Sequence, residues 1–394
     1  MVRSFRRTPV AIAAAVVVAA TGSAALSARS ALPDDPPEPT AVTASAPRTA
    51  ETVLGQMTLA QRVGQLFMVG TPATSASRAT LSAVRRRHVG NVMLTGRSHD
   101  GTATPARVAA ALQARATPRA TDGVRLLVAT DQEGGLVQVL NGPGFSDMPT
   151  ALQQGRWTAA RLRHRAGVWA RQLTRAGVNM NLAPVEDTVP SARAALRNPP
   201  IGAFDREFGY RVAVVASHGR AFALGMSRHG VVPTIKHFPG LGRVHANTDT
   251  SSGVTDDVTT RDDAYLTPFR RSIDAGVPVV MVSLAYYHRI DPRRPAAFSP
   301  VVIRSMLRGD LGFGGVVVSD DLADARQVAS WAPGARAVRF LRAGGDLVLA
   351  VDPGTLPAMY DAVLHRARQH APFRAAVDAA ALRVLTLKQE RGLL

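Results

Sequence analysis

Charged side chains stand directly after several short apolar runs of this 394-residue sequence. Lys236 and His237 end one run, Asp131 follows another, and Asp320 follows a third. Carboxylates that converge with a Lys and a His, without a cluster of metal-ligating histidines, suit acid/base or covalent glycosyl chemistry. The alternative for any single Asp is a helix N-cap or a loop brace. Several such strand ends together favour a reactive site.

Lys236 is unusual in this composition. The chain has 47 Lys plus Arg, yet Lys236 and Lys388 are its only lysines. A compact ammonium acts as a point charge, whereas a guanidinium is a planar fork. Lys236 is therefore a candidate for hydrogen bonding to a ligand oxygen. The alternative is an ion pair that closes the rim of the fold.

Eight apolar runs rich in β-branched residues, Leu and Met predict eight buried strands. They span residues 65–70, 89–94, 124–130, 178–183, 231–238, 277–283, 315–319 and 346–351. Segments with helical spacing lie between them, at 161–177, 210–229, 265–275, 301–311 and 335–343, and several end in a glycine suited to a helix C-cap. This alternation predicts an α/β fold with a single (β/α)8 TIM-type barrel, whose chemistry belongs at the C-terminal ends of the strands. An open doubly wound sheet is disfavoured because its Gly-x-Gly-x-x-Gly signature is missing.

The N-terminal part predicts export. Arg3, Arg6 and Arg7 precede an apolar stretch and a small-residue end, which is typical of a signal peptide. We expect residues 1–30 to be a signal peptide or N-terminal anchor, 31–50 a disordered Pro-rich linker, and 51–394 the catalytic barrel. The protein body is then secreted or held in the cell envelope.

The amino-acid composition excludes several kinds of site and partner. The absence of cysteine rules out disulfides and thiolate sites. The formal charge is +18, but the basic residues are scattered and aromatic residues make up 5%, so we expect no nucleic-acid partner. This charge could favour association with acidic polymers of a cell wall. We expect no cofactor, no metal and a monomer.

Three segments resemble the family 3 glycoside hydrolases, and most closely their single-domain bacterial β-N-acetylglucosaminidase branch. They are Lys236-His237-Phe238-Pro239-Gly240-Leu241-Gly242, Thr130-Asp131-Gln132-Glu133-Gly134-Gly135 and the run from Gly312 to Asp321. The resemblance extends over residues 57–351. It implies that Asp320 is the nucleophile and that sugar hydroxyls are bound by Asp131, Arg206, Lys236 and His237. Asp321 is expected to brace its loop.

The sequence departs from that branch at the proton donor. The branch has Asp-Ser-His in the loop after Lys-His-Phe-Pro-Gly, and its His is the general acid; here those places hold Asn247, Thr248 and Asp249. His245 lies nearby but too early in the loop to be the same residue. Three readings are open: Asp249 donates the proton, His245 donates it with Asp249 as its orienting partner, or the acid is lost.

The resemblance implies an exported retaining exo-β-N-acetylhexosaminidase. It would hydrolyse terminal non-reducing N-acetylglucosamine from cell-wall-type glycans through a covalent glycosyl-Asp intermediate. One alternative is a related β-glucosidase or β-xylosidase, because Leu136, Val139 and Leu284 stand where the branch usually has cationic residues. Another is a secreted sugar-binding homologue that has lost turnover.

Overall fold

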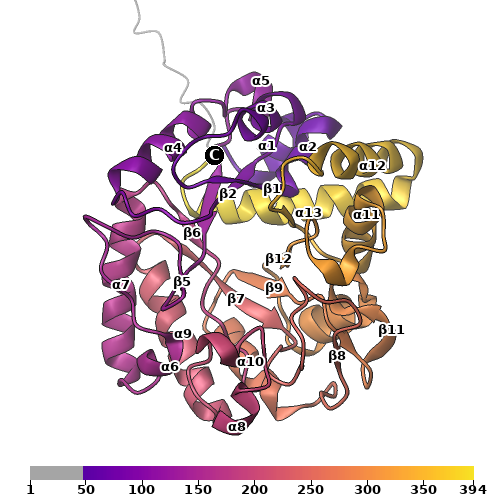
Figure 1. The fold of residues 1–394 in the computed structure, drawn as a ribbon. Helices are drawn as coiled ribbons and strands as arrows, with labels where there is room; N and C mark the ends of the chain where they lie inside the picture. The colour runs from indigo at the N-terminus through magenta and orange to yellow at the C-terminus, as the bar shows by residue number, and fades with distance from the viewer. Residues whose placement is uncertain (1–47) are drawn as a thin grey trace, which may run out of the picture. The chain divides into compact units, whose positions relative to one another are not determined.

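Eight parallel strands form one sheet that curls into a barrel, with helices around it (Figure 1). The computed structural model describes residues 48–394, so the predicted signal peptide and most of the predicted linker lie outside the described residues. The barrel strands are β1 (Phe67–Pro72), β2 (Asn91–Thr95), β3 (Leu127–Thr130), β6 (Met180–Asn181), β7 (Val232–Phe238), β9 (Val279–Val282), β12 (Val316–Ser319) and β13 (Val348–Ala350). Each falls in, or overlaps, one of the eight predicted runs, so the predicted barrel is confirmed.

Strand pairing follows the chain around the ring. The order is β12, β9, β7, β6, β3, β2, β1 and β13, and every pairing is parallel. A parallel bridge between Val318 of β12 and Leu347, directly before β13, joins the two ends of the sheet. The C-terminal ends of all eight strands therefore meet at one rim.

Helices cover the outside of the ring. They include α2 (Leu59–Gln65), α3 (Arg78–Arg87), α4 (Ala103–Gln113), α7 (Ala159–Arg175), α9 (Val212–Ser227), α10 (Thr267–Asp274), the π-helical segment η4 (Val301–Asp310), α11 (Pro333–Ala343) and α12 (Leu356–Gln369). The five predicted helices correspond to α7, α9, α10, η4 and α11. Gly177, Gly230 and Gly276 have positive φ angles of 75°, 80° and 81° where chains leave α7, α9 and α10, as the C-cap prediction requires.

Apolar side chains fill the interior of the ring. The buried cluster inside the barrel consists of Met68, Met93, Leu127, Ala129, Met180, Leu182, Val232, Val279, Met281, Val316, Val318, Leu347 and Leu349, together with Val384, Leu387 and Leu393 from the C-terminal region. The last helix, α13 (Ala371–Glu390), supplies Val384 and Leu387 to this cluster. It therefore covers the N-terminal end of the barrel and leaves the other rim open for a site.

Short elements build the loops around the barrel. Two small sheets consist of β4 (Gln132–Gly134) with β5 (Val137–Gln138), and of β8 (Thr255–Asp256), β10 (Tyr286–Tyr287) and β11 (Asp291–Pro295). The remaining short helices are α1 (Ala50–Gln56), α5 (Pro118–Thr121), α6 (Ala151–Gln154), α8 (Ala192–Ala195), η1 (Gly202–Phe204), η2 (Ala264–Leu266), η3 (Ala296–Phe298) and η5 (Arg326–Val328). Helix α1 begins at Ala50, so the end of the linker predicted for 31–50 is ordered. Within residues 48–394, no helix has both the length and the apolar character needed to cross a bilayer.

Candidate active site

A cavity of about 400 Å³ opens at the C-terminal rim of the barrel. Its polar lining includes six of the seven site residues predicted from the sequence: Asp131, Arg206, Lys236, His237, Asp249 and Asp320. Its apolar lining includes Met93, Leu182, Met281 and Leu349, which also belong to the cluster inside the barrel. The barrel core therefore closes the bottom of the cavity, and charged groups surround its upper part.

Lys236 is at the centre of an ion network. Its Nζ donates to Asp131 Oδ1 at 2.7 Å and lies 2.6 Å from Glu133 Oε1. Glu133 also accepts two hydrogen bonds from Arg206, from Nε at 2.8 Å and from Nη2 at 2.8 Å. Two cations and two carboxylates thus share one site, and each cation is held by a short, charge-assisted hydrogen bond.

Burial and neighbouring charges shift the pKa values of this network in opposite directions. Burial alone would raise the pKa of Glu133, but the Arg206 and Lys236 cations outweigh it and hold this pKa at about 2. Burial alone would lower the pKa of Lys236, but Asp131 and Glu133 outweigh it and the pKa is raised. Glu133, Arg206 and Lys236 are therefore charged at neutral pH, and the network offers fixed charges to the hydroxyls of a ligand.

Glu133 was not among the predicted site residues, although it completes the network. The signal was present in the sequence, because Asp131 and Glu133 are two residues apart in extended chain and side chains at i and i+2 share one face. Both carboxylates reach Lys236, whose side chain is 4% exposed. Glu133 anchors Lys236 and Arg206, while Asp131 and the two cations line the cavity.

His237 is oriented by a buried carboxylate. Its Nδ1 lies 2.7 Å from Asp187 Oδ2, and Asp187 Oδ1 accepts from the backbone N–H of His237 and of Leu241. Because Asp187 already accepts from two backbone N–H groups, it acts as the acceptor and His237 Nδ1 as the donor. This pairing leaves the other ring nitrogen, Nε2, for a ligand in the cavity.

Asp320 and Asp321 have different surroundings. Asp320 follows β12, its N–H donates to Val282 O, and its Oδ1 accepts from the N–H of Asp321. Asp321 accepts three backbone hydrogen bonds, from Ala323, Asp324 and Val351. This is the geometry of a loop brace, as expected for Asp321. Asp320 keeps a carboxylate oxygen that can face the cavity.

Asp249 lies in the loop after β7 and faces the same cavity as Asp320. The loop desolvates this carboxyl, and the negative charge of Asp320 adds to that effect, so that the pKa of Asp249 is raised to about 6. Its side chain is nevertheless open to solvent at the mouth of the cavity. A carboxyl with a pKa of about 6, coupled to a second carboxylate, is suited to giving up a proton near neutral pH.

The loop that carries Asp249 is tied to the loop after β12. Arg326 N–H donates to Asp249 O, and Gln327 N–H donates to Thr248 O. The Gln327 side chain also makes two hydrogen bonds with the backbone of Val254. Asp249 and Asp320 are therefore positioned by loops that contact each other directly.

His245 is the predicted site residue that the structure does not bring to the cavity. It is exposed, and its Nδ1 hydrogen bonds to the backbone oxygen of Arg197. The three positions that replace expected cations also avoid the lining: Leu284 is fully buried, Val139 packs against the core, and Leu136 is 59% exposed. None of these three side chains therefore forms part of the cavity wall in this protein.

The described residues offer little to a metal ion. Within 48–394, no group of three or more His, Asp or Glu side chains is arranged to hold one. The chemical groups that the cavity does present are carboxylates, a lysine, an arginine and a histidine. They suit a polyhydroxylated ligand, because carboxylates accept from hydroxyls and the cations donate to them.

Comparison with known proteins identifies the family. The model of the glycosyl hydrolase family 3 N-terminal domain matches residues 58–387. The chain belongs to glycosyl hydrolase family 3. A β-hexosaminidase from Stenotrophomonas maltophilia (strain K279a) is 31% identical over 328 residues, which are 80% of this chain and 92% of the relative. The family assignment agrees with the predicted resemblance and with a glycoside hydrolase.

Two solved structures share the fold of this chain. The crystal structure of β-N-acetylhexosaminidase from Beutenbergia cavernae DSM 12333 is 55% identical, with a TM-score of 0.83, and the match covers 84% of this chain and 99% of that one. A family 3 β-N-acetylglucosaminidase from Paenibacillus sp. str. FPU-7 is 32% identical with a TM-score of 0.78, covering 86% of this chain and 63% of that one. In this family fold, the cavity at the C-terminal rim is the expected place for hydrolysis.

Proposed function

We propose that this protein is an exported, retaining exo-β-N-acetylhexosaminidase that removes terminal non-reducing N-acetylglucosamine from cell-wall-type glycans. The observation that carries the proposal is Asp320, at the end of β12, in one cavity with Asp131, Arg206, Lys236 and Asp249. The 55% identity to a β-N-acetylhexosaminidase over 84% of this chain supports the choice of sugar.

The first chemical step uses two carboxyl groups. Asp320 attacks the anomeric carbon, the glycosidic bond breaks, and protonated Asp249 gives its proton to the departing oxygen. The products of this step are a glycosyl ester on Asp320 and a free alcohol. In the second step, ionised Asp249 takes a proton from water, which attacks the same carbon and releases the sugar and the Asp320 carboxylate. Two inversions retain the β-configuration.

Two features support the assignment of Asp249 as acid/base. It lines the cavity with Asp320, whereas His245 hydrogen bonds to Arg197 outside it. Its pKa is raised to about 6 by desolvation and by the charge of Asp320, so at pH values near 6 a substantial fraction of Asp249 carries the proton that the leaving oxygen receives while the ester forms. When Asp320 is esterified its charge is removed, which lowers the pKa of Asp249 and favours its role as a base.

The shape of the cavity supports cleavage at a chain end. Met93, Leu182, Met281 and Leu349 close its floor, so that a polymer cannot pass through. Asp131, Arg206 and Lys236 are on its walls, where a terminal sugar can exchange hydrogen bonds with fixed charges. The apolar floor then contacts the carbon atoms of the ring.

A panel of aryl β-glycosides tests the sugar specificity. We expect kcat/KM for the N-acetylglucosaminide to exceed that for the glucoside and the xyloside by at least about 100-fold, because a polar pocket built for one set of groups rejects an analogue that lacks them. A preference for glucoside or xyloside would favour the related glycosidase. Sugar binding with no turnover of an aryl glycoside or a natural disaccharide would favour the binding protein.

Trapping tests the covalent step. A slow mechanism-based fluorinated glycoside should add one glycosyl group to the intact protein, and peptide mapping should place it on Asp320. A label on another residue, or product with inverted configuration during turnover, would refute the proposed nucleophile.

Export rests on the N-terminal sequence alone. We expect a fusion of residues 1–50 to a reporter enzyme to carry the reporter out of the cytoplasm. Replacing Arg3, Arg6 and Arg7 by Glu should retain the reporter inside. Reporter that stays cytoplasmic with the native segment would refute export.

A further inference from the structure

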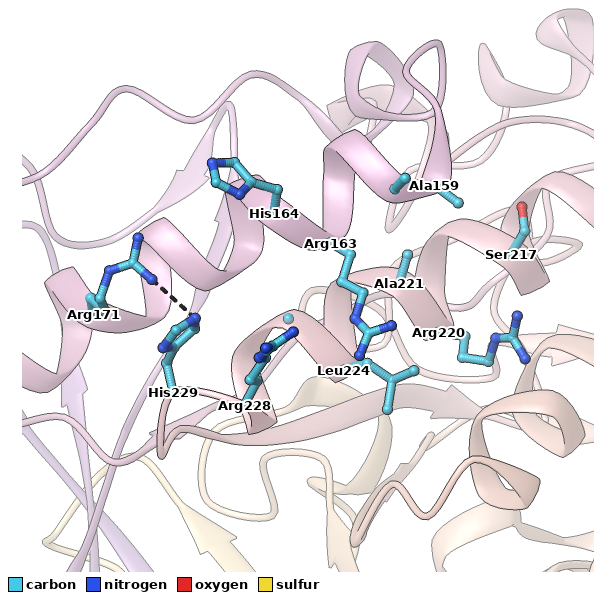
Figure 2. Close-up of a pocket in the computed structure, with 12 residues that line it drawn as sticks. Ala159, Arg163, His164, Arg171, Ser217, Arg220, Ala221, Leu224, Arg228 and His229 are labelled. Carbon is cyan, nitrogen blue, oxygen red and sulfur yellow. Dashed lines mark hydrogen bonds between the residues drawn. The ribbon is translucent and has the colours of Figure 1, made fainter. Parts of the chain in front are cut away.

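A second cavity, of about 610 Å³, lies between α7 and α9 on the outside of the barrel (Figure 2). Four of its lining residues are arginines, Arg163 and Arg171 from the α7 side and Arg220 and Arg228 from the α9 side, and His164 and His229 also line it. No carboxylate lines this cavity, and it has no lining residue in common with the rim cavity. We refer to it as the arginine groove.

The arginine groove is elongated along both helices. Arg163 and Arg171 are eight residues apart along α7, and Arg220 and Arg228 are eight residues apart along α9 and its C-cap, which corresponds to about 12 Å of helix rise in each case. Figure 2 shows the Arg163 side chain extending from α7 toward α9, and Arg171 hydrogen bonded to His229. Positive groups therefore line the groove along its length.

Small residues make the bottom of the groove. Ala160, Ala221 and Gly225 line it, and α7 packs so closely there that a Cβ atom on Gly225 would lie 2.4 Å from Arg163 O. Because the bottom carries almost no side-chain bulk, a ligand can approach between the arginines. All four guanidinium side chains belong to exposed residues and can adjust to a ligand.

The charge of the groove is not neutralised nearby. Residues 148–185, which include α7, contain no Asp or Glu, and neither do residues 208–248, which include α9. None of the four arginines forms a salt bridge within the described part of the chain. Burial, and then the Arg171 and Arg228 cations, lower the pKa of His229, which is the effect expected in a strongly positive environment.

The chemistry of the lining selects a class of ligand. A guanidinium binds two-oxygen anions, such as a phosphodiester or a carboxylate, through paired hydrogen bonds. Single-stranded nucleic acids are usually held by large aromatic side chains on which the bases stack, and no Phe, Tyr or Trp lines this groove. An extended groove with cations spread along its length fits a chain that carries repeated anionic groups and no aromatic ones.

We propose that the arginine groove binds a linear anionic polymer whose repeating groups are phosphodiesters or carboxylates on an aromatic-free backbone. Such binding is separate from the hydrolytic reaction, because the groove and the rim cavity share no residue. It holds the barrel on a polyanionic matrix through its side and leaves the rim open to substrate.

Fluorescence anisotropy with labelled oligomers tests the proposal on the full-length protein at about 0.15 M salt, where non-specific surface attraction is largely screened. The probes are a glycerol phosphate oligomer, an oligogalacturonate and an oligo-dT of similar length. We expect the glycerol phosphate oligomer or the oligogalacturonate to bind. The one of these two that binds more tightly identifies the anionic group. Tighter binding of oligo-dT than of both would overturn the aromatic-free assignment, and no binding of either aromatic-free oligomer would overturn the site.

Charge-matched variants separate the groove from the general excess of arginine. Arg163→Gln/Arg228→Gln removes two groove cations, and Arg85→Gln/Arg86→Gln removes two exposed cations of α3 that form no salt bridge within the described residues. We expect the groove variant to weaken binding about five- to tenfold and the α3 variant to leave it unchanged. Equal loss in both would overturn the proposal. Hydrolysis of a small aryl glycoside should be unaltered in both variants and reports that each is folded.

Discussion

The only two lysines of the chain are both buried, at opposite ends of the same barrel, and their surroundings differ. Lys236, at the C-terminal rim, contacts two carboxylates, Asp131 and Glu133. Lys388, in α13 at the other end, donates to two neutral oxygens, Gln65 Oε1 and Gly90 O, at 2.7 Å each. Burial lowers the pKa of Lys388 to about 7, whereas the carboxylates outweigh burial and raise that of Lys236.

The difference separates a binding site from a structural contact. At the rim, opposite charges hold one another ionised in a cavity that a ligand can enter. At the opposite end, the ammonium donates to a backbone and an amide oxygen below the barrel core, and no carboxylate within residues 48–394 forms a salt bridge with it. We therefore expect changes at the rim to alter activity, and changes at Lys388 to alter how stability depends on pH.

Removing the nucleophile should have the largest effect. Asp320→Ala should lower kcat for an aryl N-acetylglucosaminide by at least about 10⁴-fold, because no ester can form. The melting temperature should change little, since the Asp320 side chain accepts only from Asp321 N–H. Asp324→Ala, which changes another acidic residue of the same lining, is the matched control and should retain activity within about tenfold. Full activity of Asp320→Ala would contradict the assignment.

Breaking the rim network should cost both activity and stability. Lys236→Met leaves Asp131 and Glu133 with Arg206 as the one remaining cation of the network, so we expect a loss of about 3–5 kcal/mol in the free energy of unfolding. We also expect kcat/KM to fall by at least about 100-fold. Urea unfolding and steady-state kinetics measure the two losses. Lys236→Arg should recover part of the stability but not the activity, because a fork replaces a point charge; unchanged kinetics in either variant would argue against a role in binding.

Lys388 should make the stability of the protein depend on pH. Because folding lowers its pKa from 10.5 to about 7, the unfolded chain binds more protons between these values, and the stability should rise with pH across that window. We expect the free energy of unfolding of the wild type to increase by a few kcal/mol relative to Lys388→Met between pH 7 and 10. Parallel pH curves for the two proteins would show that Lys388 is not desolvated in this way. The kcat of Lys388→Met should equal that of the wild type.

Asp249 should determine the pH dependence at the rim. It must be protonated to act as the acid, so kcat/KM for a natural disaccharide should fall as the pH rises through about 6. In Asp249→Asn this fall should disappear, and the rate should be about 100-fold lower. An activated aryl glycoside, whose leaving group needs no proton, should be affected less in the bond-breaking step. His245→Ala is the control and should keep the wild-type profile; loss of the fall in that variant would transfer the role to His245.

The smallest effect is expected at the mouth of the cavity. Phe204 lines the cavity and is 42% exposed, so it can stack on the sugar of the leaving group. Phe204→Ala should raise KM for a disaccharide about fivefold and leave KM for a small aryl glycoside unchanged. Equal changes for both substrates would show that Phe204 acts on the terminal sugar instead.

Local sequence patterns predicted the ring well, for a physical reason. Strands buried on both faces must be apolar throughout, and glycines such as Gly177 end helices where a positive φ is needed. Both signals are local and can be recognised in single segments. Parallel strands end together, so the sequence also predicts that Asp131, Lys236 and Asp320 lie at one rim.

Contacts between segments that are far apart in the sequence leave no local pattern from which they could be predicted. Asp187 fixes His237 across 50 positions, and Glu133 joins Arg206 across 73, and no local pattern encodes either pairing. Glu186 shows the same limit, because it stands beside Asp187 in the sequence but its carboxyl hydrogen bonds to Ser272 and packs on Gly219, away from the cavity. His245 was a plausible donor by sequence distance, but the loop directs it to Arg197.

The pairing of the first strand with the last affects how the protein is made. Phe67 of β1 pairs with Val348 of β13. The first barrel strand can therefore pair with β2 early, but with β13 only after nearly the whole chain has been synthesised. Until then it offers an unpaired edge, which invites association with other chains. Nascent protein stalled before β13 should therefore depend on chaperones far more than the finished chain does.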